Sequence, residues 1–445
     1  MQTKPSVDLK RDLGIISGLS MVVGTVIGSG IFFKQASVLE MAGGQTQGLL
    51  AWGLGGIITL AAGLTIAEVG SRIPKAGGLY SYIDGIYGHL MGFLTGWSQV
   101  VVYAPAVIAS IGGYAAHLTA NFLGLDLIWA RWIGVGYICF VMGLNLLGNR
   151  IAAGFAVLTT AVKMIPIIIL IVYGLFFGRV DAVGETVTQV TATPGGSFGM
   201  AVLATLFAYD GWVLVANIRD EMKNPKRDLP LSIVFGVLLI LLSYLGVTYG
   251  VYRVLPAQEI VNLKDNAVFA VVKSAFGLLG GRIMSLIIII SMLGTMNGKM
   301  VAFPRMAYNM SKDGLFPNYL KNLSTKSFVP AQATITIALM AILIAAFTDS
   351  ADLLSNLAIF TIWIFYVLAF IGVFILRYRQ KNMQLKIDFK TPLFPITPLI
   401  GIFGGTFVVG STLITDFKGA MASIIMVLVG IPVYYYYSNK QKHMK

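Results

Sequence analysis

The chain of 445 residues is 57% apolar and only 11% charged, with a mean hydropathy of +0.81. Soluble domains carry roughly 25% charged residues, so this composition excludes a soluble globular protein and predicts a polytopic membrane protein. The net charge is +13, but the basic residues lie in connecting segments, which indicates membrane orientation rather than a nucleic-acid partner. Cys139 is the single cysteine, which excludes an internal disulfide or a cysteine-rich metal site, and we expect no cofactor.

Apolar runs of membrane-spanning length recur along the whole chain. A spanning helix needs about 20 apolar residues. Twelve runs approach or exceed this length, at residues 14–38, 48–71, 87–117, 127–148, 151–177, 197–219, 229–255, 277–311, 329–347, 353–379, 395–415 and 418–438. The sequence therefore predicts an all-α polytopic membrane protein with twelve transmembrane helices embedded in a lipid bilayer.

The basic residues are distributed unevenly between the two sides of the membrane. Most lysines and arginines lie in the N-terminal segment, in the connections that follow even-numbered spans and in the C-terminal tail. Basic connections stay in the cytoplasm under the positive-inside rule, so both termini are expected to be cytoplasmic. Residues 1–12 are polar and precede an apolar run too long for a signal-peptide core, so no cleavage is expected.

The first span is interrupted near its centre by the segment Gly24-Thr25-Val26-Ile27-Gly28-Ser29-Gly30-Ile31-Phe32. Glycine weakens a helix and allows backbone angles that other residues resist, so the chain can unwind here. Freed amides suit a carboxylate and freed carbonyls suit an ammonium group, so one break can hold both ends of an amino acid. The alternative is helix packing, because Gly24 and Gly28 also form a G-x-x-x-G motif.

The sixth span has a second interruption, Phe207-Ala208-Tyr209-Asp210-Gly211-Trp212, which places an acid beside a glycine where hydrocarbon is expected. An offset of five spans gives the two halves of the chain opposite orientations. This pattern is typical of an inverted repeat with a binding site at the membrane midplane, and it favours a transporter. Taken alone, Gly211 could serve helix packing and a neighbouring donor could neutralise Asp210.

Further motifs lie in and beside the connections: Arg72-Ile73-Pro74-Lys75-Ala76-Gly77-Gly78-Leu79-Tyr80, Gly92-Phe93-Leu94-Thr95-Gly96-Trp97, Lys223-Asn224-Pro225-Lys226-Arg227-Asp228-Leu229-Pro230 and Asp313-Gly314-Leu315-Phe316-Pro317. We interpret residues 67–82 as a cytoplasmic lid or re-entrant loop and residues 219–230 as a charged loop. Together with Gly28-Ser29-Gly30-Ile31-Phe32, these motifs resemble the L-amino acid transporter family of the amino acid–polyamine–organocation superfamily, over nearly the whole chain.

The resemblance implies a LeuT-like five-plus-five inverted repeat with discontinuous helices 1 and 6, plus helices 11 and 12. In that fold, spans one, two, six and seven form a bundle that rocks against spans three, four, eight and nine. The implied divisions are a cytoplasmic N-terminus at 1–12, a first repeat at 13–178, a second repeat at 196–380, helices 11 and 12 at 395–438, and a cytoplasmic C-terminus at 439–445.

By the same resemblance, the substrate carboxylate is expected on the backbone amides of Gly28, Ser29 and Gly30. The ammonium group is expected near the backbone carbonyls of Val26 and Ile27 and, across the site, of Phe207 and Asp210. Ala208 belongs to the same expected substrate-binding set. Tyr209 matches a bulky position that closes over the substrate as a gate. Animal members join a glycoprotein through a cysteine between spans three and four, and residues 118–126 contain none. A disulfide-linked ancillary subunit is therefore not expected, and a bacterial plasma membrane fits better.

Lys163 lies within span five, where a lysine costs about 2.5–3.5 kcal/mol on insertion scales and needs a partner. In sodium-coupled relatives of this fold the same region helps to hold a sodium ion, and here an ammonium group would occupy that space. Two roles stay open, namely a fixed strut that binds the unwound carbonyls of span one and a titrating proton carrier. Lys299 in span eight is expected at the rim of the cavity or in solvent.

These features predict a sodium-independent exchanger of small neutral L-amino acids, such as alanine, serine, cysteine or threonine, that works by alternating access. Glu68 and Asp210 lie deep in spans, and neither offers a clear counter-ion for a cationic side chain. Tyr103 and Asn297, with Tyr209, could limit the pocket and offer hydrogen bonds. The alternatives are a proton-coupled amino acid symporter and, in another class, a channel or membrane-embedded receptor. An enzyme is not expected, because no nucleophile–base constellation or metal-ligand cluster stands out.

Overall fold

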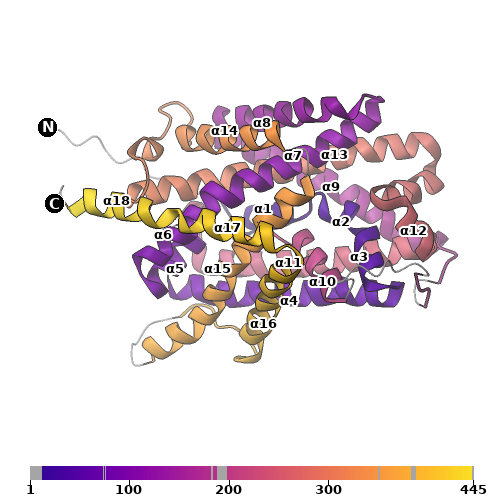
Figure 1. Cartoon of the computed structure of the whole chain (residues 1–445). Coiled ribbons are helices and arrows are strands. Elements are labelled where there is room, and N and C mark those ends of the chain that lie inside the picture. Colours follow the sequence, from indigo (N-terminus) through magenta and orange to yellow (C-terminus); the bar gives the residue numbers. More distant parts are fainter. Residues whose placement is uncertain are drawn as a thin grey trace.

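Long helices packed side by side make up nearly all of the computed structural model (Figure 1). The structure describes residues 13–73, 75, 77–181, 184–187, 198–348, 351–381 and 387–442. Within these residues the sole β-structure is a pair of isolated bridges, which confirms the all-α fold.

The first part of the chain forms α1 (Ile15–Val26), α2 (Gly30–Phe33), α3 (Gln35–Ala42), α4 (Gln45–Arg72), α5 (Leu79–Tyr87), α6 (His89–Trp97), the π-helical η1 (Ser98–Tyr103), α7 (Ala104–Leu123), the short 3-10 turn η2 (Leu127–Trp129), α8 (Ala130–Leu147) and α9 (Asn149–Phe177). The second part forms α10 (Phe198–Ala208), the 3-10 segment η3 (Trp212–Glu221), α11 (Pro225–Val254), α12 (Ala257–Leu263), η4 (Lys264–Asn266), α13 (Ala267–Lys312), η5 (Asn318–Lys321), α14 (Ala331–Phe347), α15 (Ala351–Arg379), α16 (Ile396–Thr415), α17 (Phe417–Leu428) and α18 (Gly430–Lys442).

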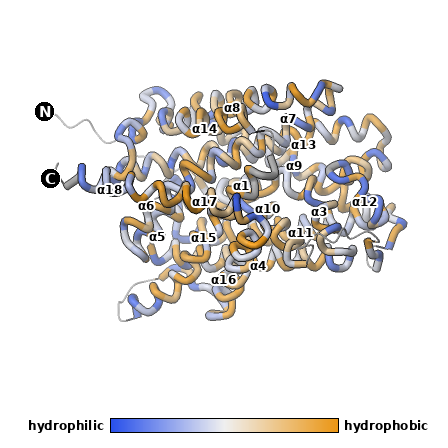
Figure 2. The backbone as a smooth tube through the Cα atoms, in the orientation of Figure 1, coloured by the Kyte–Doolittle hydropathy of each residue, from blue (hydrophilic) through white to orange (hydrophobic). Residues whose placement is uncertain are grey.

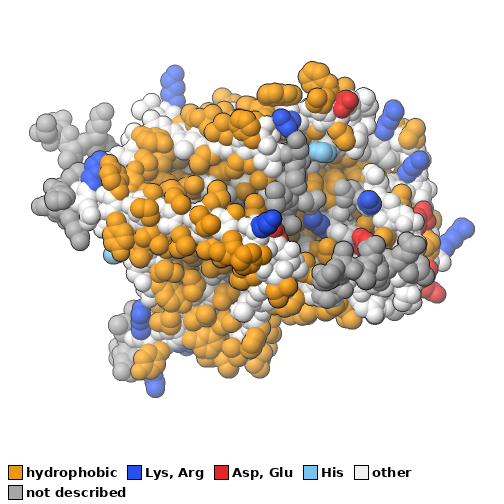
Figure 3. Space-filling view, viewed as in Figure 1, with side chains coloured by type: hydrophobic (Ala, Val, Ile, Leu, Met, Phe, Trp, Pro, Cys, Tyr) orange, Lys and Arg blue, Asp and Glu red, His pale blue; other side chains and the backbone are white. Residues whose placement is uncertain are grey.

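Helical stretches of membrane-spanning length and hydropathy occur eleven times in the described residues, and α14, with 17 residues, is a shorter apolar helix. Figure 2 shows hydrophobic residues along most of the helical tube and hydrophilic residues mainly at helix ends and connections. Hydrophobic side chains also cover much of the outer surface in Figure 3. The chain is therefore a multi-pass membrane protein. We call the side on which α1 begins and α4, α13, α15 and α18 end the terminal face.

Three helical segments differ from the prediction, two in where they begin and one in its helix type. The prediction of a charged loop through residue 230 is wrong, because α11 already begins at Pro225; proline is tolerated in a first helical turn, and Asp228 places a negative charge there. Helix α13 begins before the eighth predicted span and is kinked at Gly277, whose φ is 67°. Span three contains the π-helical η1, a feature that length and hydropathy do not reveal.

Spans one and six are both interrupted, as predicted. Residues 27–29 are unwound between α1 and α2, and residues 209–211 are unwound between α10 and η3. Helix α1 packs against η3, whereas α2 and α3 pack against α10. The two broken helices therefore cross the molecule in opposite directions, the arrangement that an inverted repeat predicts.

Candidate functional site

The two breaks lie directly against each other. The hydroxyl of Thr25, two residues before the first break, donates to the carbonyl of Gly211 at 3.1 Å. A Cβ atom on Gly30 would lie 2.5 Å from the Cα atom of Ala208, so glycine permits an approach that a larger residue would prevent. The unwound segments of the two helices thus adjoin each other.

Three backbone amides in the first break have no acceptor among the described residues. Among the residues that the structure describes, the N–H groups of Gly28, Ser29 and Gly30 donate to no carbonyl or side chain, although all three residues are buried. A buried N–H group without a partner is rare and costs free energy. A ligand carboxylate would provide the missing acceptors.

Lys163 of α9, which is fully buried, reaches the other side of the first break. Its Nζ atom lies 2.8 Å from the carbonyl oxygen of Gly24, 2.6 Å from that of Ile27 and 3.2 Å from Thr295 Oγ1. Thr295 Oγ1 lies 3.0 and 2.9 Å from the same two carbonyl oxygens. An ammonium group has three N–H donors, and each has an acceptor here. The Ile27 carbonyl, predicted to receive the substrate ammonium group, is therefore bound by donors of the chain itself.

Asp210 in the second break is enclosed by side chains from three other helices. Tyr103, at the end of η1, donates a hydrogen bond to its Oδ2 atom, and the Tyr366 hydroxyl of α15 lies 3.4 Å from its Oδ1 atom. Lys299 of α13 lies 3.6 Å from Oδ2 and 3.3 Å from the Tyr103 hydroxyl. Because the Lys299 side chain is only 3% exposed, the expectation that it reaches solvent is wrong. The carboxylate is thus neutralised inside the protein.

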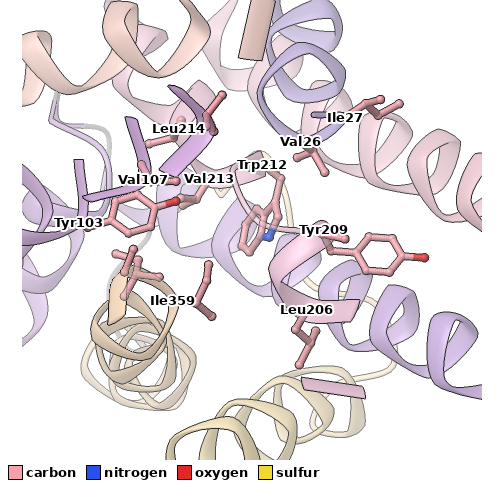
Figure 4. Close-up of a cluster of buried hydrophobic side chains, with 14 of the residues drawn as sticks. Val26, Ile27, Tyr103, Val107, Leu206, Tyr209, Trp212, Val213, Leu214 and Ile359 are labelled. Atoms are coloured by element: carbon pink, nitrogen blue, oxygen red, sulfur yellow. The ribbon is translucent and has the colours of Figure 1, made fainter. Parts of the chain in front are cut away.

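Tyr209 points away from this acid. Figure 4 shows Tyr103 and Tyr209 on opposite sides of Trp212. The Tyr209 hydroxyl donates to the Trp52 carbonyl of α4 at 3.1 Å, and its ring packs against Trp52 and Tyr244 with centroid distances of 6.1 and 4.9 Å. The structure therefore places this ring between α4 and α11 rather than over the first break.

Phe207 and Asn297 occupy different environments. Phe207 is partly exposed, and the Lys34 Nζ atom lies 5.5 Å from the centre of its ring. Asn297 accepts a hydrogen bond from Asn145 of α8 at 2.9 Å and donates to the Ala152 carbonyl of α9 at 3.0 Å. Its amide is therefore engaged between helices rather than presented to the breaks.

The connection interpreted as a lid contains helix α5 on the terminal face. Pro74 lies outside the described residues, but Tyr80 donates to Asp313 at 2.9 Å. Burial, together with this carboxylate, raises the pKa of Tyr80, so the phenol stays protonated and keeps donating. A Cβ atom on Gly78, whose φ is 58°, would lie 2.2 Å from Asn217 Oδ1 of η3. Helix α5 therefore closes against the second half of the broken sixth span.

Sequence reasoning missed Tyr244, Thr295 and Tyr366. The Tyr244 hydroxyl lies 3.0 Å from the Ala208 carbonyl oxygen and 3.4 Å from that of Val26, so it joins the two breaks. Thr295 and Tyr366 lie in helices distant in sequence from the breaks that they contact, whereas Tyr244 lies in the helix that follows the second break and reaches across to the first. Polar side chains in membrane helices commonly form hydrogen bonds with neighbouring helices. The three hydroxyl groups therefore indicated contacts between helices, but the sequence did not indicate which helix each would contact.

The chain matches a family model described as amino acid permease over residues 13–435. The chain belongs to the amino acid permease family. This permease is 41% identical to the serine/threonine exchanger SteT of Bacillus subtilis (strain 168), over 96% of this chain and 97% of that relative. It is 30% identical to the cystine/glutamate transporter of Homo sapiens, over 96% of this chain and 85% of the relative. It is also 28% identical to the human b(0,+)-type amino acid transporter 1, with coverages of 90% and 83%.

These matches confirm that the permease is of the L-amino acid transporter type within the amino acid–polyamine–organocation superfamily. The family and these relatives are transporters rather than enzymes. Within the described residues of the permease, no group of three or more histidine, cysteine, aspartate or glutamate side chains could hold a metal ion.

Proposed function

We propose that this permease is a sodium-independent exchanger of small neutral L-amino acids, such as alanine, serine, cysteine or threonine, that works by alternating access. The observation that carries the proposal is the set of three buried amides at Gly28, Ser29 and Gly30, which have no acceptor among the described residues. Amides at a broken helix bind substrate carboxylates in transporters of this architecture. The serine/threonine exchanger among the relatives supports exchange and small substrates.

Selectivity for neutral side chains follows from the second break. A cationic side chain needs an unpaired anion in the pocket, and Asp210 is already paired with Lys299 at 3.6 Å. Tyr103 donates to the same carboxylate, which leaves it poorly suited to a second cation. Alanine and serine place no charge against this cluster.

Sodium independence follows from Lys163, whose ammonium group is bound to the carbonyls of span one. The second candidate function is a proton-coupled symporter. It is favoured by one observation, that Lys163 is fully buried and its hydrogen-bond partners are neutral oxygen atoms, an environment in which a lysine can lose its proton.

The proposed location is a bacterial cell membrane with both termini in the cytoplasm, because basic residues are concentrated in connections on the terminal face. A disulfide-linked ancillary subunit is not proposed. The single cysteine, Cys139, lies inside the membrane-spanning helix α8, away from the connection that would meet an external partner.

Counterflow into proteoliposomes tests the function. Vesicles loaded with L-serine should take up labelled serine and alanine without sodium, whereas empty vesicles and vesicles offered arginine should not. Uptake of arginine above that of alanine at equal concentration would contradict the selectivity. Uptake into empty vesicles driven by a pH gradient would establish the symporter instead.

A further inference from the structure

A buried ion pair lies on the terminal-face side of the two breaks. Glu221 ends η3, and Arg305 lies in α13. The Arg305 Nε and Nη2 atoms lie 2.5 and 3.3 Å from the two carboxylate oxygens of Glu221, and each side chain is only 7% exposed. Arg305 Nη2 also donates to Asn149 Oδ1, at the start of α9, at 3.2 Å. The pair therefore joins the second half of broken span six to α13 and, through Asn149, to α9.

A cavity of about 110 Å³ lies directly behind this pair. It runs beside the first half of α1, past Ser17 and Ser20, to Gly298 of α13. A Cβ atom on Gly298 would lie 2.6 Å from Thr25 Cγ2, so the inner end of the cavity adjoins the contact between the two breaks. Among the described residues that line it, Glu221 is the one acid and Arg305 the one base.

We propose that Arg305 is a second recognition site for the substrate carboxylate, on the terminal-face side, and that Glu221 occupies this site when no substrate is present. This proposal rests on the proposed exchange function. Opening this face requires η3 to separate from α13, which takes the carboxylate away from a buried guanidinium. A buried charge that loses its partner is strongly unfavourable. An amino acid arriving from this side brings a carboxylate for Arg305 and an ammonium group for Glu221.

This arrangement would make exchange obligatory. The empty transporter has no carboxylate to replace Glu221, so its terminal face stays closed and net efflux is suppressed. A transporter that holds an amino acid in the cavity opens, because the zwitterion matches both members of the pair by charge and by hydrogen bonding.

The test uses the purified full-length protein in proteoliposomes selected for one orientation, with L-serine as the probe. For Arg305→Gln, the KM for serine on the terminal-face side should rise about tenfold, because the carboxylate loses its guanidinium partner. For Glu221→Gln, the same KM should fall, because the competing carboxylate is gone. In both variants serine efflux into serine-free buffer should increase relative to exchange.

Three controls distinguish a loss of substrate recognition at Arg305 from a loss of folding. Arg305→Lys keeps the positive charge and should shift the KM less than Arg305→Gln, and a gel-filtration profile identifies any variant that does not fold. Lys226→Gln removes an exposed terminal-face ion pair, with Asp388 at 3.3 Å, and should leave KM and efflux unchanged. Equal KM shifts in the same direction for Glu221→Gln and Arg305→Gln would overturn the proposal. Failure of the parent protein to exchange serine would instead overturn the proposed function.

Discussion

Both helix breaks interrupt a membrane-spanning helix, but they expose different chemical groups. In the first break the carbonyls of Gly24 and Ile27 are bound by Lys163 and Thr295, while the adjacent amides have no acceptor in the part of the chain that the structure describes. In the second break the charge is supplied by Asp210 and satisfied within the protein by tyrosines and Lys299. We therefore propose that the first break offers donors to a ligand, whereas the second sets which side chains the site accepts. Each break depends on one buried lysine, and substitutions at the two breaks should fail in different ways.

The largest effect is expected at the first break. Gly30→Val should abolish substrate binding, because its Cβ atom would lie 2.5 Å from Ala208 Cα and its branched side chain would crowd the amides. Isothermal titration of the purified protein with L-serine measures the loss. Gly143→Val, at a helical glycine with open space around it, is the matched control and should bind normally. Tight serine binding by folded Gly30→Val would refute the carboxylate site.

The next largest effect is expected at Lys163, where substitutions distinguish a fixed strut from a proton carrier. Lys163→Ala removes charged hydrogen bonds worth about 1.5–3 kcal/mol each, so exchange should fall at least about tenfold. Lys163→Arg should also fail, because a planar guanidinium does not fit acceptors arranged around a compact ammonium group. The exposed Lys418→Ala variant is the control. Proton movement coupled to alanine influx in sodium-free vesicles, detected with a pH-sensitive dye and lost in Lys163→Ala, would show proton coupling.

A change of specificity rather than a loss is expected at the second break. Lys299→Gln leaves Asp210 without its cation, so arginine should become a substrate while serine exchange weakens. The double variant Lys299→Gln with Asp210→Asn should lose arginine exchange again. Counterflow with both amino acids measures the switch. If arginine were transported equally by the single and the double variant, the carboxylate would have no part in selectivity.

The smallest effects are expected at Tyr209. Tyr209→Phe removes one hydrogen bond to the Trp52 carbonyl, worth about 1 kcal/mol, and should lower thermal stability slightly. Tyr209→Ala also empties the space beside Trp52 and Tyr244, and should slow exchange more than it weakens equilibrium binding. Stopped-flow measurement gives the exchange rate, and titration with L-serine gives the equilibrium binding constant. Weak binding at an unchanged maximal rate would exclude a gating role.

The series of apolar helices and both breaks could be predicted because hydropathy and glycine act locally along the chain. The partners of Asp210 could not, because Tyr103, Lys299 and Tyr366 come from three other helices whose rotation depends on packing. The direction of the Tyr209 side chain could not be predicted for a related reason. It lies in unwound backbone, where helical periodicity no longer indicates which way a side chain points.

The π-helical segment η1 makes span three sensitive to its residue count. A π-helical turn contains more residues than an α-helical turn, so Ser98–Tyr103 sets the rotational phase between α6 and α7. Tyr103 is the last residue of that segment and the donor to Asp210. Deleting one residue, such as Val101, would let the segment become α-helical and turn the phenol away from the carboxylate. The number of residues in span three, as much as its composition, thus keeps Tyr103 within hydrogen-bonding distance of Asp210.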